Sequence, residues 1–203
     1  MELKANNISF SYNKKKPILK DISLSLNSNQ IIGLIGDSGS GKSTLCKIMS
    51  GYITHYTGEV TLDGQKIPEN GFDPVQLIFQ HPEKTMNPKW KMEKVLRESW
   101  IPTQELKDTF GLKDNWLNRW PSELSGGELQ RFSILRALNP KTKIIIADEI
   151  STMLNAVTQV QVWEALIANC KANDIGILAV SHDKDLLEVV CDDILYFNEI
   201  NKL

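Results

Sequence analysis

Two patterns of apolar and polar positions alternate along the chain. Residues 8–26 (ISFSYNKKKPILKDISLSL) alternate apolar and polar side chains on both sides of a Lys-rich turn, which predicts a hairpin of half-exposed strands. Continuous apolar runs at 30–36, 143–148 and 176–181 are typical of strands buried on both faces. The chain therefore combines a half-exposed antiparallel region with a fully buried sheet.

Further strands and helices lie between these runs. Residues 58–67 predict a strand with a turn at Asp63-Gly64, and residues 75–79 predict a short buried strand. Helical spacing of apolar residues predicts helices within 43–52, 128–138 and 158–174, the first from Leu45, Ile48, Met49 and Tyr52. Since strands alternate with helices, we expect an α/β fold with a mostly parallel sheet.

Residues 84–123 differ in character from the rest of the chain. They contain several prolines, short helical patterns and four of the five tryptophans, namely Trp90, Trp100, Trp116 and Trp120. This composition predicts a helical subdomain inserted into the α/β core. Exposed tryptophans would suit an interface, and core packing of the small subdomain is the other interpretation. We expect residues 1–203 to form a single domain with this insertion.

Composition narrows the class of protein. A chain of 203 residues can form one domain with a real core, and its net charge of −2 gives no basic field for nucleic acid. The three cysteines are far apart, which favours reduced thiols in the cytosol over disulfides or metal ligands. No apolar run has the length of a membrane span, and no secretion signal is visible.

The segment GDSGSGKS, residues 36–43, fits the pattern G-x-x-x-x-G-K-[ST] of a phosphate-binding loop. It follows a buried strand and opens a helix, so backbone amides and the helix dipole can meet a phosphate. Lys42 would neutralise the β and γ oxygens, and Ser43 would bind Mg²⁺. The alternative is a Gly/Ser-rich turn without a ligand. The candidate nucleotide-binding residues are Gly36, Asp37, Ser38, Gly39, Ser40, Gly41, Lys42, Ser43 and Thr44.

Two carboxylates end the strand KIIIADE. Beside a phosphate-binding loop, Asp148 is placed to hold the Mg²⁺ shell, and Glu149 could polarise an attacking water. The alternative is an acidic strand end that caps the next helix.

The segment LSGGE, residues 124–128, opens a predicted helix with two adjacent glycines. Ser125 and Glu128 have the spacing of a capping box, so an ordinary helix start is one interpretation. A cap needs no pair of glycines, however, and each costs about 0.5–1 kcal/mol relative to alanine inside a regular element. Gly126 and Gly127 would let unpaired amides of the first turn meet an anion directly.

Taken together and in this order, the motifs resemble the ATP-binding subunit of an ABC transporter over nearly the whole chain. The resemblance implies a P-loop NTPase core with an N-terminal antiparallel β subdomain and an inserted α-helical subdomain, working with ATP and Mg²⁺. LSGGE resembles the family signature, through which Ser125, Gly126, Gly127 and Glu128 would contact the γ-phosphate of an ATP held by a second subunit.

The resemblance assigns roles to three further residues. Gln80 resembles the Q-loop glutamine, which touches Mg²⁺ and the water, and His182 resembles the switch histidine that contacts the γ-phosphate. Together with Glu149 they would form the catalytic set. Tyr12 lies where family members stack an aromatic ring on adenine. The alternatives are a solvated glutamine, a structural histidine and a half-buried strand tyrosine.

One loop departs from the family pattern. The D-loop usually reads S-A-L-D, whereas residues 152–155 read TMLN, so Asn155 replaces the usual aspartate. Asparagine keeps an acceptor and loses the charge, which would weaken the rate or the coupling across an interface. It could also mark one unequal half of a heterodimer.

Residues 79–98 (FQHPEKTMNPKWKMEKVLRE) resemble the branch that serves oligopeptide and nickel importers. This implies a peripheral subunit on the cytoplasmic face of the cell membrane. Its partners would be a second ABC ATPase subunit (identical or paralogous), integral membrane permeases and, indirectly, an extracytoplasmic substrate-binding protein, with no nucleic acid. The end of the sequence soon after its last expected strand favours the nickel members.

The cargo and the activity leave alternatives open. The cargo could be nickel or another metal, free or bound to a metallophore, or an oligopeptide. A catalytically weak regulatory subunit of a heterodimer is the main competing function. A non-transport ABC protein usually needs two cassettes or a long coiled coil, and neither is present.

Overall fold

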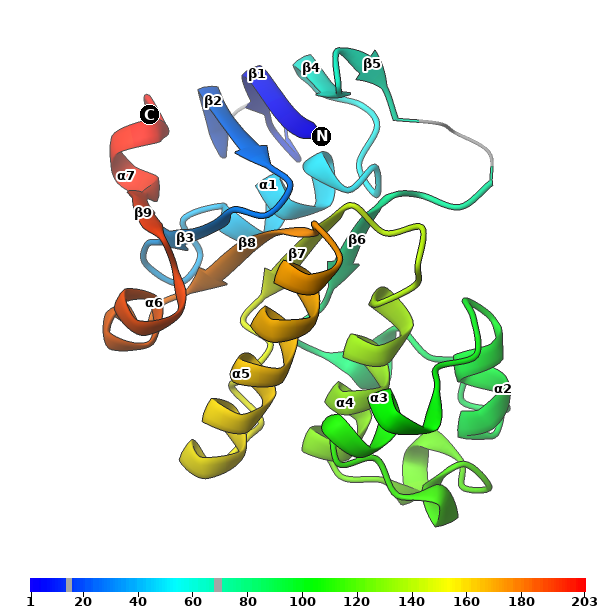
Figure 1. The fold of residues 1–203 in the computed structure, drawn as a ribbon. Coiled ribbons are helices and arrows are strands. Elements are labelled where there is room, and N and C mark those ends of the chain that lie inside the picture. The colour runs from blue at the N-terminus through cyan, green and yellow to red at the C-terminus, as the bar shows by residue number, and fades with distance from the viewer. Residues whose placement is uncertain (14–15, 68–70) are drawn as a thin grey trace.

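The computed structural model describes residues 1–13, 16–67 and 71–203 and contains two sheets and a separate group of helices (Figure 1). The four-stranded sheet has the order β2-β1-β4-β5, and its neighbouring strands are antiparallel. Its strands are β1 (Glu2–Phe10), β2 (Leu19–Asn27), β4 (Thr57–Leu62) and β5 (Gln65–Lys66). The predicted hairpin of β1 and β2 is confirmed, while residues 14–15 of its turn lie outside the described residues.

The second predicted turn, between β4 and β5, also forms. Asp63 has φ 50° and Gly64 has φ 74°. Two consecutive positive φ values are typical of the type I′ turn, whose twist matches the flanking strands.

The five-stranded sheet is parallel throughout, as the alternation of strands and helices predicted. Its order is β6-β7-β8-β3-β9, formed by β6 (Val75–Ile78), β7 (Ile144–Asp148), β8 (Gly176–Ser181), β3 (Ile31–Ile35) and β9 (Asp193–Tyr196). Because every strand runs the same way, the carboxyl ends of all five meet at one edge, where ligands of open α/β sheets bind.

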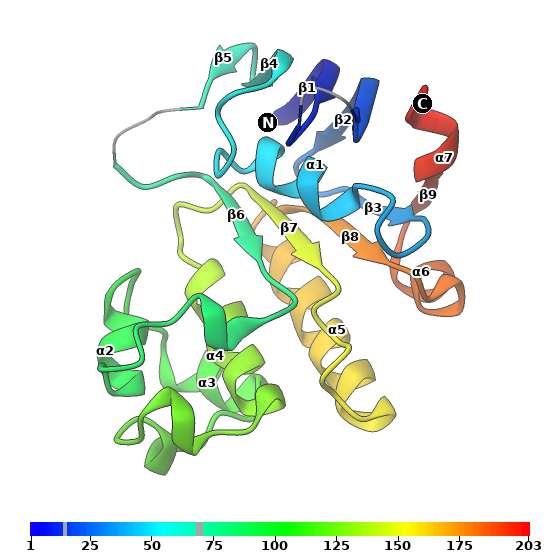
Figure 2. The same cartoon turned by 180° about the vertical axis from the view of Figure 1, so that it is seen from behind.

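Both faces of the parallel sheet are buried, because alternate residues of each central strand enter different cores. Ile144 and Ile146 join the cluster beneath the antiparallel sheet and α1 (Lys42–Met49), whereas Ile145 and Ala147 join the cluster around α5 (Ala156–Ala172). Figures 1 and 2 show α1 between the two sheets and α5 on the far face of the parallel sheet. Helix α1 is shorter than predicted: it ends at Met49, and Tyr52 lies beyond it, exposed.

Residues 84–123, predicted to form a helical subdomain, are all described by the structure and contain helices and loops but no strand. This segment follows η1 (Pro82–Lys84), holds α2 (Met92–Arg97), α3 (Gln104–Thr109), η2 (Asp114–Trp116) and η3 (Pro121–Glu123), and leads into α4 (Gly126–Ala137). Figure 1 shows this group to one side of the parallel sheet, away from the antiparallel one. Trp90, Trp100 and Trp116 contribute to the core, and Trp120 is exposed.

Two short helices complete the chain: α6 (Lys184–Val190) and α7 (Phe197–Ile200). Within the described residues, no helix combines the length and apolarity that crossing a membrane requires.

Helix α7 packs directly on the segment predicted to bind phosphate. A Cβ added at Gly36 would lie 2.8 Å from Cβ of Phe197. Beyond α7, Asn201 Oδ1 accepts a hydrogen bond from the Lys20 amide at 2.9 Å, and Asn201 Nδ2 donates to the Ile18 carbonyl at 3.0 Å. The C-terminal segment therefore ties the phosphate loop to β2.

Replacing Phe197 with alanine should lower the free energy of unfolding by about 3–5 kcal/mol, because its ring is almost fully buried and would leave a cavity beside the loop. Urea denaturation measures this. Val189→Ala is the control, because its side chain is largely exposed, and it should change the value by less than about 0.5 kcal/mol. A loss below about 1 kcal/mol for Phe197→Ala would show that the ring does not hold the segment in place.

Candidate nucleotide-binding site

The phosphate-binding loop joins the end of β3 to the start of α1. Gly39 and Gly41 have φ values of 78° and 116°, a region that favours glycine. Lys42 is buried, and its Nζ donates to the carbonyls of Gly36 at 2.6 Å and Asp37 at 2.8 Å. The loop thus curls around its own lysine and holds a positive charge at the start of the helix.

Two buried polar atoms near this loop have no hydrogen-bond partner among the described residues: Ser40 Oγ and Asp148 Oδ1. Buried polar atoms are rarely left unpaired, so such atoms point to a missing ligand. Asp148 is only 5% exposed, and burial raises the pKa of its carboxyl, while the Ser43 hydroxyl acts in the opposite direction. A partnerless carboxylate oxygen next to a serine hydroxyl fits a cation.

Gln80, Glu149 and His182 come together at the carboxyl edge of three adjacent parallel strands, β6, β7 and β8. Gln80 Nε2 donates to Glu149 Oε2 at 3.1 Å, and His182 Nδ1 lies 3.2 Å from Glu149 Oε1. The three residues that the resemblance grouped together are therefore in mutual contact, with the glutamate between the other two.

The backbone of Glu149 is strained. Among the described residues, six other than glycine have positive φ, and all but Glu149 are asparagine or aspartate, which tolerate that region. Glu149, at φ 49°, is the exception, and such strain tends to occur at functional sites. Nothing in the sequence pattern signalled it.

Tyr12 lies beside the start of α1 and not within a strand. Its hydroxyl is 3.4 Å from Thr44 Oγ1, and its ring meets Phe10 edge to face with centroids 4.8 Å apart. Tyr12 is 58% exposed, so its ring is accessible to a planar ligand.

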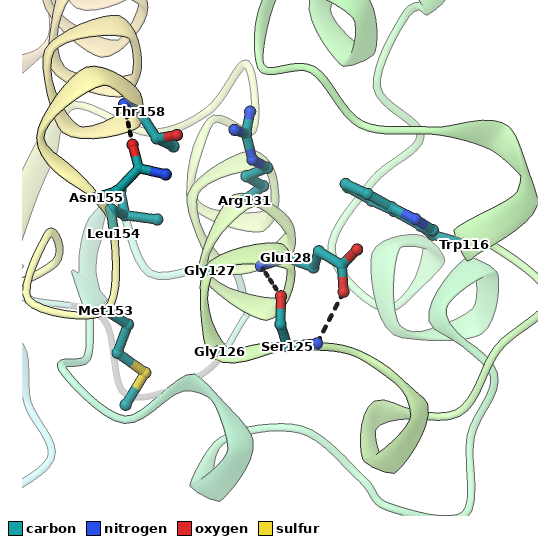
Figure 3. Close-up of a pocket in the computed structure, with 10 residues that line it drawn as sticks. All are labelled: Trp116, Ser125, Gly126, Gly127, Glu128, Arg131, Met153, Leu154, Asn155 and Thr158. Carbon is teal, nitrogen blue, oxygen red and sulfur yellow. Dashed lines mark hydrogen bonds between the residues drawn. The ribbon is translucent and has the colours of Figure 1, made fainter.

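The glycine pair of LSGGE begins α4, and the predicted capping box is present (Figure 3). Glu128 N donates to Ser125 Oγ at 3.3 Å, and Ser125 N donates to Glu128 Oε2 at 2.8 Å. The glycines themselves face another segment of the same chain. A Cβ on Gly126 would lie 2.6 Å from Met153 Sδ, and one on Gly127 would lie 3.0 Å from Leu154 Cδ2.

A hollow of about 440 Å³ opens at this helix start. Its lining comes from the LSGGE segment, Trp116, Arg131, Thr158 and the loop Met153–Asn155, and includes no residue of the phosphate-binding loop. The phosphate loop lines a different hollow, with His182 and residues 196–199. The chain therefore does not place its LSGGE segment over its own phosphate loop.

With this geometry established, comparison with known families decides the class of protein. The ABC transporter family matches residues 19–152, about two thirds of the chain, and includes the phosphate loop, Gln80, LSGGE and the two carboxylates. The chain belongs to the ABC transporter family. It is accordingly an ATP-binding ATPase.

Similar proteins agree with this assignment. The ABC ATPase is 33% identical to the nickel import system ATP-binding protein NikE of Staphylococcus aureus strain bovine RF122 / ET3-1, over 98% of this chain and 87% of the relative. The same protein of strain N315 is 32% identical over the same shares.

Solved structures match the fold. An ATP-binding subunit of an ABC transporter has a TM-score of 0.82 at 21% identity and covers 97% of this chain and 85% of its own. A dimeric ATP-binding cassette in a post-hydrolysis state, bound to ADP and phosphate, has a TM-score of 0.80 at 24% identity, covering 96% and 93%.

Proposed function

We propose that this ABC ATPase is the ATP-hydrolysing subunit of an importer that takes up nickel, free or bound to a metallophore. The main support for ATP hydrolysis is the contact of Glu149 with both Gln80 and His182 beside the phosphate loop. The similarity to a nickel import ATP-binding protein over almost the whole chain supports nickel as the transported substrate.

The phosphate loop would hold the triphosphate of ATP. Residues 36–41 lead directly into the start of α1, where backbone amides can meet a phosphate and the helix dipole adds positive potential. Lys42, whose Nζ donates hydrogen bonds to two carbonyls of the loop, would turn its ammonium group towards the β and γ oxygens of the nucleotide. Tyr12, whose ring is exposed, would stack on the adenine.

Mg²⁺ fits the oxygen atoms beside the loop. Ser43, Asp148 and Gln80 offer a hydroxyl, a carboxylate and an amide oxygen, the hard ligands that this ion prefers. The partnerless Oδ1 of Asp148 supports the assignment. When bound, the ion would supply positive charge against the phosphate oxygens.

Glu149 would act as the general base for the attacking water. A hydrogen bond from Gln80 holds one carboxylate oxygen and His182 Nδ1 lies 3.2 Å from the other, and opening the bond to Gln80 would free Oε2 to accept a proton from water. His182, on the other oxygen, would steady the γ-phosphate and the water. These contacts favour an active enzyme over the catalytically weak regulatory subunit.

The LSGGE segment would serve an ATP held by a second cassette. Ser125, Gly126 and Gly127 line a hollow whose lining includes no residue of the chain's own phosphate loop. An anion there must come from elsewhere, which supports two cassettes packed head to tail with ATP between them. The second cassette would be a copy or a paralogue.

A groove beside β6 would receive the permease. Two adjoining hollows of about 90 and 170 Å³ share Tyr52, Gln76 and Leu77. Tyr52 is exposed and meets Phe79 edge to face at 5.1 Å, one residue before Gln80. A helix of the permease held here would place the subunit on the cytoplasmic face of the membrane and link it, indirectly, to an extracytoplasmic binding protein.

Asn155 is compatible with this function. Its side chain caps α5 by accepting a hydrogen bond from the Thr158 amide at 2.9 Å. Asparagine and aspartate are about equally good caps, so the loop keeps its local geometry without the charge.

Uptake of radioactive nickel tests the proposal. Cells that contain the chain and its permeases should accumulate nickel, and cells that contain the Glu149→Gln variant should not. A parallel arm uses a labelled oligopeptide. Uptake of the peptide alone would replace nickel as cargo, and uptake of neither would contradict the importer. Failure of the chain to co-purify with membrane subunits would favour a non-transport role.

A further inference from the structure

We infer that residues 84–97, the basic segment that contains α2, bind the anionic lipid surface of the membrane that holds the permease. The inference rests on the proposed function and adds a lipid partner to it. The basic segment contains five basic residues and one acidic residue, although the whole chain has a net charge of −2. Its charge is therefore opposite in sign to that of the chain as a whole and suits an anionic surface.

Most of this positive charge is free to meet an anion from outside. Within the part of the chain that the structure describes, no ion pair involves the four exposed lysines of the segment: Lys84, Lys89, Lys91 and Lys94. The acid of the segment, Glu93, is already paired, because its Oε1 lies 2.9 Å from Arg97 Nη2. The four lysines therefore form a surface of uncompensated charge.

Two tryptophans lie among these lysines. Lys91 Nζ is 5.4 Å from the ring centroid of Trp120, and Lys94 Nζ is 4.1 Å from that of Trp90. Trp120 is 44% exposed. Tryptophan is enriched where proteins meet the headgroup region of a bilayer, because its ring is apolar and its N–H is polar. Lysines beside it would meet the lipid phosphates.

Backbone hydrogen bonds bring Trp120 to the start of α2. The Met92 amide donates to the Arg119 carbonyl at 2.9 Å, and the Glu93 amide donates to the Leu117 carbonyl at 2.9 Å. One carboxylate also lies here, because Glu123 Oε2 accepts a hydrogen bond from the Trp120 amide at 2.8 Å. The positive excess therefore comes from the lysines of the basic segment and not from the loop that carries Trp120.

The basic segment borders the groove proposed to receive the permease. Thr85, within the segment, and Ser99, two residues beyond it, both line one hollow of that groove. Ser99 Oγ donates to the Arg136 carbonyl at 2.9 Å, which joins the end of α2 to α4. Figures 1 and 2 show α2 at the outer edge of the helical group. A permease seated in the groove would bring the bilayer to this side of the subunit.

A lipid surface fits these cations better than an acidic peptide does. The four lysines are exposed and are spread over the segment, so they offer diffuse charge and not a shaped site for one carboxylate. Lysine binds phosphate as a point charge, whereas paired recognition of a carboxylate favours arginine. A layer of lipid phosphates is equally diffuse, and each nearby cation adds to the binding.

Flotation of the chain with lipid vesicles tests the inference. The chain should bind vesicles made of equal parts of phosphatidylcholine and phosphatidylglycerol, and it should not bind phosphatidylcholine alone. About 1 M salt should release it, because screening then acts within about 3 Å. Lys91→Ala/Lys94→Ala should bind the anionic vesicles about 30-fold more weakly, since each lysine near the surface contributes about 5-fold.

Matched variants separate the basic segment from total charge and from packing. Lys4→Ala/Lys171→Ala removes the same charge from exposed positions elsewhere and should bind like the wild type. Lys91→Arg/Lys94→Arg keeps the charge and should also bind like the wild type. Anionic vesicles should shift the tryptophan emission of the wild type to shorter wavelength, and the shift should be smaller in Trp120→Phe.

Three results would overturn the inference: no binding of the wild type to anionic vesicles, equal binding to neutral vesicles, or equal losses in the two alanine double variants. If the wild type bound no vesicles and Lys91→Ala/Lys94→Ala co-purified with less permease, the partner would be an acidic segment of the permease. The proposed function fails differently, because the wild-type transporter would then show no ATP turnover or no nickel uptake, whatever the vesicles showed.

Discussion

Glu149→Gln should lower steady-state ATP turnover by about 10²–10⁴-fold, the usual contribution of general-base catalysis. The carboxylate lies between Gln80 Nε2 at 3.1 Å and His182 Nδ1 at 3.2 Å, so it is oriented before substrate arrives. Glutamine has the same shape and can keep one of these contacts, but it cannot take a proton from water. The defect should therefore lie in turnover and not in ATP binding.

Phosphate release by the assembled transporter measures this effect, and a fluorescent ATP analogue measures binding. Glu188→Gln is the matched control, because Glu188 is exposed and pairs with Lys184 within α6 and not with Gln80, Glu149 or His182. It should retain full turnover. If Glu149→Gln kept more than about a tenth of the wild-type rate, a different group would have to be the base.

Lys42→Ala should weaken ATP binding by roughly 30- to 5,000-fold, which corresponds to the 2–5 kcal/mol lost when one partner of a buried charge pair is removed. Lys42 is buried at the start of α1, and its Nζ lies 2.6 Å and 2.8 Å from two carbonyls of the loop. The charge is thus held where the triphosphate would bind. Alanine is a good helix former, so α1 should persist.

Isothermal titration with ATP gives the affinity, and circular dichroism checks the fold. Lys171→Ala, an exposed lysine in the last turn of α5, is the control and should bind ATP normally. Unchanged affinity in Lys42→Ala would show that the backbone amides alone hold the phosphates.

The features of the fold that depend on local pattern were predictable. Strands with continuous apolar runs, such as β7 and β8, had to be covered on both faces, and this alone implied helices on either side. The capping box of Ser125 and Glu128 was also predictable, because it depends only on two residues three positions apart.

Features that depend on distant contacts were missed. Gly126 gave no indication that Met153, 27 positions later, would occupy the space of its missing Cβ. Helix α7 was not predicted, since its role depends on the phosphate loop against which Phe197 packs. Tyr52 matched the spacing of α1, but the helix ends at Met49. Among the candidate roles, the sequence could group Gln80, Glu149 and His182 only through family resemblance, because their meeting depends on the order of β6, β7 and β8.

The left-handed backbone at Glu149 has a consequence for protein engineering. A side chain with Cβ at this φ of 49° costs about 1–2 kcal/mol, which glycine would recover. Selection of a variant library for thermal stability alone should therefore enrich glycine at position 149. The selected variants would be more stable but would no longer hydrolyse ATP. Selection of stabilised variants of this ATPase therefore has to measure ATP turnover as well as melting temperature, because glycine at this position would raise stability and abolish activity.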